Sequence, residues 1–139
     1  MNGKRVRKMN VRLLRRVQKH ILDNPEHFDM SQWFWSPDFE SIYNTGRSIY
    51  KPACGTPACI GGHVIALCGE TTTLSGVQAK AAKLLDLTEA QSRRLFYTWE
   101  WPDDLEWKYE VAAQVGNAQR AAEVASERID LFIKTKGKK

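Results

Sequence analysis

Residues 54–69 read CGTPACIGGHVIALCG, and they contain signals for both ends of a helix. Thr56 and Pro57 are typical of a helix start, because threonine caps free amides and proline fits the first helical position. Gly69 can end the helix, because glycine is the residue that most often follows the last turn of a helix. Between these ends the apolar side chains point in several directions, which is typical of a buried helix. The sequence therefore predicts a central helix over about 56–68.

The predicted central helix contains two adjacent glycines. Gly61 and Gly62 each cost about 1 kcal/mol of helix propensity relative to alanine. Glycine is tolerated inside a helix where a neighbour packs closely against the backbone. We therefore expect another segment to approach the helix at these two positions.

A further helix is predicted on the N-terminal side. Asn10 can cap a helix that runs to about Asp23, and the apolar residues of this helix fall on one face. Asn24-Pro25 ends it and can open a short turn. The segment at about 28–55 has no helical period, so we expect it to be long and irregular, with any strands confined to 36–53.

Four more helices are predicted on the C-terminal side, over about 75–85, 88–96, 102–115 and 118–133. Ser75 is the expected cap of the first of these. Thr88 and Gln91 form a capping box at the start of the second, in which each side chain satisfies a free backbone amide. Together these signals predict a mostly all-α fold of five to six helices around the buried central helix.

Composition indicates one domain. The 139 residues, 42% hydrophobic and 27% charged, are typical of a single globular unit. We expect a single helical domain at 10–134, between a flexible basic arm at 1–9 and a flexible basic tail at 135–139. No apolar stretch is long enough to span a bilayer, and no export signal follows the basic N-terminus. We therefore expect a cytoplasmic protein with reduced thiols and no membrane partner.

Three parts of the sequence carry a resemblance to a known family. They are Asn24-Pro25-Glu26 with Phe28-Asp29 and Trp33, the run 54–62, and the leucine-containing pieces 84–87 and 95–96. In order and spacing they resemble small uncharacterised proteins from bacteria and their phages, whose motif is Cys-Gly-Thr-x-x-Cys-Ile/Phe-x-Gly. The resemblance implies a shared fold and a phage or mobile-element setting, and it implies no activity. His63 departs from it, since similar sequences more often carry tryptophan there.

Cys54, Cys59 and His63 are the sharpest cluster of chemically reactive residues, and three interpretations are open. As metal ligands they would supply three of the four donors that zinc takes, with His20, His27 or a carboxylate as the fourth. As catalytic residues, Cys59 would be a nucleophile at a helix start and His63 its base. As packing residues they would be part of the core, without a metal or cofactor, and we favour this interpretation.

Aromatic and basic residues supply candidate binding surfaces. Tryptophan and arginine dominate the energetics of protein interfaces, and we expect at least one of Trp99 and Trp101 to face solvent. The helix over 10–23 carries basic side chains that could contact phosphates. The candidate binding residues are Arg12, Arg15, Arg16, Lys19, Trp33, Trp35, Trp99 and Trp101.

The function predicted from the sequence is that of a non-enzymatic binding protein, a phage or mobile-element factor that engages a host protein. The first alternative is a nucleic-acid-binding protein that uses the basic N-terminal helix. The second alternative is a cysteine-dependent enzyme or a zinc protein at Cys54, Cys59 and His63.

Overall fold

The computed structural model describes residues 8–34, 51–52 and 57–139. Within these residues the chain forms helices and no strands, so the predicted all-α fold is confirmed. None of the described helices is both long and apolar enough to cross a membrane. The α-helices are α1 (Val11–Asp23), α3 (Ile60–Cys68), α4 (Val77–Leu85), α5 (Glu89–Phe96), α6 (Asp103–Gln114) and α7 (Ala118–Lys134). The short 3-10 helices are η1 (Pro25–His27), η2 (Leu74–Gly76) and η3 (Thr98–Glu100).

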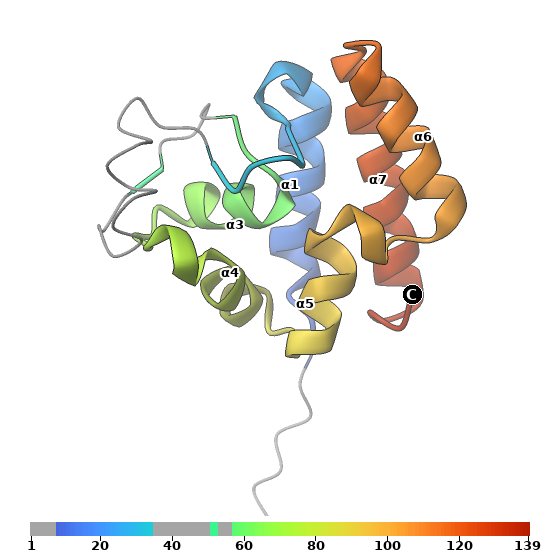
Figure 1. The fold of residues 1–139 in the computed structure, drawn as a ribbon. Coiled ribbons are helices and arrows are strands. Elements are labelled where there is room, and N and C mark those ends of the chain that lie inside the picture. Colours follow the sequence, from blue (N-terminus) through green and yellow to red (C-terminus); the bar gives the residue numbers. More distant parts are fainter. Residues whose placement is uncertain (1–7, 35–50, 53–56) are drawn as a thin grey trace, which may run out of the picture.

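The helices pack in two groups that meet at α1 (Figure 1). On one side lie α3, α4 and α5, and on the other side α6 and α7 form a hairpin. α1 contacts both α3 and α7, and its buried side chains Leu14, Val17 and Ile21 fill the junction. All of α3 from Ile60 to Ala66 is buried, which confirms the prediction of a buried central helix.

The start of α3 differs from the prediction. Cys59 is the N-cap, and its Sγ accepts the N–H of Gly62 at 3.5 Å. Pro57 precedes the helix instead of opening it, and Thr56 lies outside the described residues. The helix therefore begins three residues after the predicted first position at Pro57.

Backbone pairing with the segment around η1 explains this late start. The N–H of Ala58 donates to the carbonyl of His27, and the N–H of Cys59 donates to the carbonyl of Gln32, both at 2.9 Å. Because these amides are used in extended pairing, the chain turns into a helix only at Ile60. The long-range pairing overrides the local start signal.

The irregular segment predicted at 28–55 is described only in part. Residues 28–34 and 51–52 belong to no helix or strand, as expected, while 35–50 and 53–55 lie outside the described residues. The close neighbour expected at Gly61 and Gly62 is confirmed, and it is Trp33 from this segment.

Hydrogen bonds confirm several predicted helix ends. Asn10 caps α1 by accepting the N–H of Leu13 at 3.1 Å. Thr88 and Gln91 form the capping box of α5, with both of its bonds present. Gly69 ends α3 in the left-handed conformation, with φ 65°. These signals are local, which is why the sequence alone could place them.

Ser75 does not cap α4, contrary to the prediction. It lies inside η2, and Gly76 is the N-cap of α4, without a side-chain bond. The N–H of Gly76 donates to the carbonyl of Thr73 at 3.1 Å, so the chain completes a tight turn before α4 begins.

The C-terminal residues 135–139, expected as a flexible tail, pack against α5 and α7. Arg94 donates to the carbonyl of Gly137 and Arg128 to the carbonyl of Lys139, both at 2.9 Å. Lys136 and Gly137 have positive φ angles of 55° and 77°, which turn the chain back toward the helices. Of the basic arm predicted at 1–9, residues 1–7 lie outside the described residues.

Candidate binding site

Cys59 and His63 lie together at the start of α3, but they are not arranged as a nucleophile and its base. The Nδ1 of His63 donates to the backbone carbonyl of Cys59 at 2.9 Å, so it does not face the thiol. The Cys59 Sγ lies 3.8 Å from the carbonyl oxygen of Trp33. Each side chain is 2% exposed, as the packing interpretation predicts.

Burial also sets the charge of these two groups. It raises the pKa of the Cys59 thiol to about 12 and lowers the pKa of His63 to about 4. At neutral pH the thiol therefore keeps its proton and the imidazole is uncharged. A reactive cysteine needs the opposite, a thiolate beside a group that stabilises negative charge.

The structure brings the other two histidines to His63. The ring centroid of His20 lies 5.2 Å from that of His63 and 5.7 Å from that of His27. In the described part of the chain, however, no three histidine, cysteine or acidic side chains are placed to hold a metal ion. Cys54 lies outside this part, so the zinc set of Cys54, Cys59 and His63 stays a prediction.

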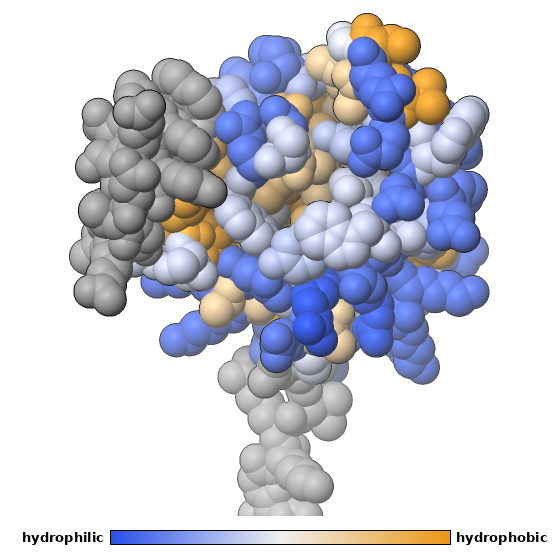
Figure 2. All heavy atoms as spheres, in the orientation of Figure 1, coloured by the Kyte–Doolittle hydropathy of each residue, from blue (hydrophilic) through white to orange (hydrophobic). Residues whose placement is uncertain are grey.

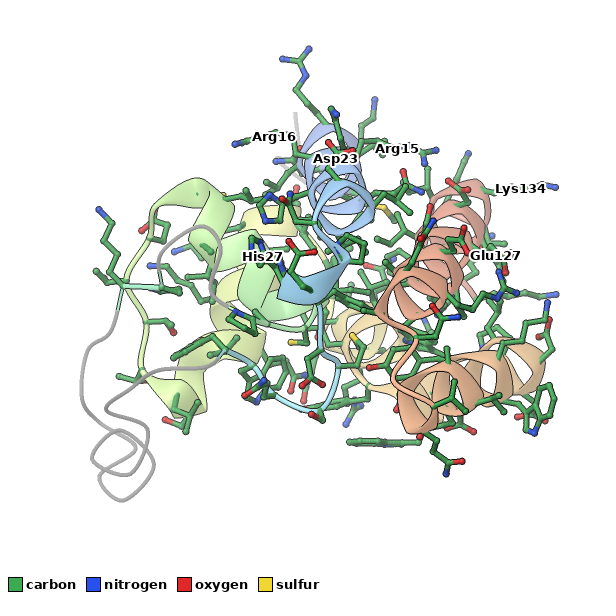
Figure 3. The ribbon with its side chains drawn as sticks, turned by 90° about the horizontal axis from the view of Figure 1, so that it is seen from above. Arg15, Arg16, Asp23, His27, Glu127 and Lys134 are labelled. Atoms are coloured by element: carbon green, nitrogen blue, oxygen red, sulfur yellow. The ribbon has the colours of Figure 1, made fainter. Side chains whose placement is uncertain are left out.

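The basic side of α1 is partly neutralised from within the domain (Figure 3). Arg15 pairs with Asp130 of α7 at 2.5 Å, and Lys19 pairs at 2.6 Å with the carboxylate four residues further along α1. Arg16 points to the other side of α1 and donates to a backbone carbonyl of α3 at 3.4 Å. Among the described residues, only Arg12 and Arg16 of the four predicted phosphate contacts lack a carboxylate partner. These ion pairs reduce the charge that α1 can offer to a nucleic acid.

The predicted surface tryptophans have different environments. Trp99 is 69% exposed, whereas Trp101 is only 3% exposed. The indole N–H of Trp101 donates to the carbonyl of Leu95 at 2.9 Å, which holds this ring in the core. The prediction of Trp101 as a surface residue is therefore wrong. Trp33 is half-buried, and Trp35 lies outside the described residues.

A row of exposed apolar side chains on α6 and its C-cap was not among the predicted site residues. Trp107, Val111 and Val115 are 67%, 40% and 72% exposed. Their spacing of four residues puts them on one side of the helix. Figure 2 shows apolar side chains at the surface where α6 ends. The opposite side of α6 packs into the core through Leu105, Tyr109 and Ala112. We call the surface formed by Trp107, Val111 and Val115 the α6 face.

Acidic residues accompany the α6 face. α6 carries four carboxylates and a single basic residue, Lys108. None of the four forms an ion pair with another described residue. The helix dipole accounts for the three in the first turn, but Glu110 lies further along, where that effect has faded. The four are Asp103, Asp104, Glu106 and Glu110.

A cavity of about 610 Å³ lies beside α6, between the loop that follows η1 and the segment that joins α5 to α6. Figure 2 shows the hollow on this side of the molecule. We call it the aromatic pocket, because its lining includes Trp33, Phe96, Tyr97, Trp99 and Tyr109. Glu110 and Asp29 line it as well. Because Glu110 directly precedes Val111 on α6, the pocket borders the α6 face at Glu110.

No protein-family model matches the chain, and comparisons with curated proteins and with solved structures found no significant match. The resemblance to bacterial and phage proteins therefore stays a prediction. The features of this chain that can indicate its function are the α6 face and the aromatic pocket.

Proposed function

We propose that the protein is a non-enzymatic binding protein that engages a protein partner through the α6 face. The observation that carries the proposal is the row of Trp107, Val111 and Val115, exposed side by side on a helix whose other side is packed. Single exposed apolar residues are ordinary, but a continuous row with a polar rim is typical of an interaction surface. Tryptophan is also enriched among the residues that contribute most to binding.

The α6 face can supply substantial free energy of association. Burying one exposed large apolar side chain contributes about 1.5–3 kcal/mol. Trp107, Val111 and Val115 are already ordered by the helix that carries them, so their burial costs little additional backbone entropy. The face is therefore a preorganised apolar surface on which a protein contact can be centred.

Charge defines the chemistry of the partner. With four carboxylates against Lys108, α6 has a formal charge of −3. We therefore propose that the partner contributes an amphipathic helix, with apolar residues along one side and lysine or arginine beside them. Such a helix docks by inserting side chains at helical spacing, and opposite charge at the rim fixes its orientation and speeds its association.

Three further points favour a non-enzymatic protein that binds a protein partner. The resemblance to small bacterial and phage proteins supports a host protein as that partner and a phage or mobile-element setting for the chain. The nucleic-acid alternative is less well supported, because Arg15 and Lys19 are already paired and the α6 face would repel phosphates. The enzyme alternative is opposed by the buried Cys59 thiol with its raised pKa.

Site-specific photocrosslinking in the native cells tests this proposal. Benzoylphenylalanine placed at Trp107 would lie in the α6 face, and the same group at Leu22, another exposed apolar residue, would lie on α1. We expect a discrete crosslinked protein from position 107 and none from position 22, with the crosslink in a basic amphipathic segment. Identical products from both positions, or none from position 107, would count against the proposal.

A further inference from the structure

The aromatic pocket has a wall whose rings are fixed by the fold. Tyr97 stacks on Trp99 with 4.6 Å between ring centroids and 18° between ring planes. Trp33 meets Tyr97 edge-on at 5.8 Å. The Tyr97 hydroxyl donates to Gln78 of α4, which holds the stacked pair in place. Since Trp99 is still 69% exposed, the indole face that Tyr97 does not cover is open to a ligand.

The aromatic pocket carries negative charge without a matching positive charge. Asp29 and Glu110 line it, and its described lining contains no lysine, arginine or histidine. Uncharged donors from Ser31 and Gln32 fix the Asp29 carboxylate. Neither Asp29 nor Glu110 has an ion-pair partner among the described residues. Burial raises the pKa of Tyr109 to about 12, and both carboxylates add to that rise, so their field reaches the pocket wall.

A cation near the pocket, Arg93, already has a carboxylate partner. Burial raises the pKa of Tyr97, and the positive charge of the nearby Arg93 lowers it. Arg93 does not line the pocket, and it pairs with Glu89 at 4.0 Å. The pocket thus combines an open indole face with two carboxylates that no described residue neutralises.

We propose that the aromatic pocket binds a cationic side chain of the partner, the guanidinium of an arginine or the ammonium of a lysine. Such a cation is attracted to the face of an indole ring, and the carboxylates beside the ring accept charge-assisted hydrogen bonds from its N–H groups. A cavity of about 610 Å³ has room for the aliphatic stem as well. The inference rests on the proposed function, because a partner docked on the α6 face would reach the pocket across Glu110.

Small probes test the pocket without the partner. The full chain, labelled with nitrogen-15, is titrated with N-acetyl-arginine amide while the indole N–H signals of its five tryptophans are followed. N-acetyl-citrulline amide has nearly the same shape without the charge, and N-acetyl-lysine amide separates ammonium from guanidinium. We expect a saturable shift of the Trp99 and Trp33 signals with at least one cationic probe, none with citrulline, and no shift of Trp107.

Matched variants locate the site. Glu110→Gln keeps the size of the side chain and should weaken binding of the cationic probe by roughly threefold or more, since it removes one of the two charges. Trp99→Leu should remove binding, because it removes the open ring face. Glu106→Gln is the control, since Glu106 is on the same helix but does not line the pocket. Unchanged spectra of the other indoles would show that each variant is folded.

The outcomes separate this inference from the proposed function. Equal shifts with citrulline and arginine probes, or no saturable shift with either cation, would overturn the cation site even if crosslinking at Trp107 succeeds. A saturable cation site with no crosslink at Trp107 would support the aromatic pocket. It would count only against partner binding through the α6 face.

Discussion

The carbonyl oxygen of Trp33 lies where a side chain on Gly62 would begin: a β-carbon built on Gly62 would be only 1.7 Å from that oxygen. At Gly61 a β-carbon would meet the Trp33 ring at 3.0 Å, a contact that a small ring movement can relieve. The loop that carries Trp33 therefore rests directly on the backbone of α3. This contact also places Trp33 at the wall of the aromatic pocket.

Replacing these glycines should destabilise the fold unequally. Gly62→Ala should cost about 3 kcal/mol, because two backbone segments must separate, and Gly61→Ala should cost less. Gly69→Ala is the control: its surroundings are open and its φ is +65°, so only left-handed strain of about 1 kcal/mol applies. Urea unfolding of the three variants measures the order. A Gly62→Ala variant as stable as the parent would contradict the packing of Trp33 on α3.

Stability should fall in mild acid because of His63. Above pH 6.5 the imidazole of His63 is neutral in the folded and in the unfolded chain. Below pH 6.5 the unfolded chain binds a proton at this imidazole, whereas the folded chain binds it only near pH 4. The free energy of unfolding should therefore drop between these limits by roughly 3 kcal/mol in total, and level off below them. His20, whose pKa is lowered mainly by burial and also by His27, adds to the same slope.

Urea unfolding at several pH values between 7.5 and 4, on the parent and His63→Leu, measures this effect. The change in the free energy of unfolding with pH is taken within each protein, so a constant loss of packing in His63→Leu cancels. We expect a shallower pH dependence in His63→Leu, with the remainder due to His20. Parallel curves for the two proteins would show that His63 is protonated equally in the folded and unfolded states.

Cys59 should resist alkylation in the native protein. Its thiol is buried and its pKa is about 12, whereas Cys68 is half-buried at the end of α3. Brief treatment with iodoacetamide at pH 7.5, followed by peptide mass spectrometry, should modify Cys68 before Cys59, and both equally in urea. Rapid native labelling of Cys59 would instead indicate a thiolate, and would revive the nucleophile interpretation.

Nucleic-acid binding should be absent at moderate salt. Phosphate contacts give affinities that fall steeply with salt, and two of the four candidate residues on α1 are held in ion pairs. A mobility-shift assay with DNA and RNA at 150 mM salt, on the parent and on the triple variant Arg12→Gln, Arg15→Gln, Arg16→Gln, checks this. A complex that forms with the parent and is lost in the triple variant would favour the nucleic-acid alternative.

The helix order and most helix ends could be predicted from the sequence, because their signals lie within one turn. The side chain of Asn10 and the Thr88–Gln91 pair cap helices using only neighbouring amides. The start of α3 could not be placed in this way. The local signal at Thr56-Pro57 competes with backbone pairing between Ala58 and His27, which are far apart in the sequence.

The binding site was harder to predict than the fold. Alternation at Trp99 and Trp101 indicated that at least one ring faces solvent. Which ring is buried depends on the bond from Trp101 to a carbonyl of α5. The row of Trp107, Val111 and Val115 was visible at helical spacing in the sequence. A different apolar stripe on the same helix packs into the core, and only the exposed fractions show which of the two faces solvent.

The affinity of the crosslinked partner for three forms of the chain tests the α6 face most directly. Trp107→Glu and Leu22→Glu each replace an exposed apolar side chain by glutamate, on α6 and on α1, and neither should alter the thermal melt by much. In isothermal titration calorimetry we expect Trp107→Glu to weaken binding by roughly thirtyfold or more, as for a central interface residue, and Leu22→Glu to bind like the parent. Equal affinities for all three forms would contradict binding through the α6 face.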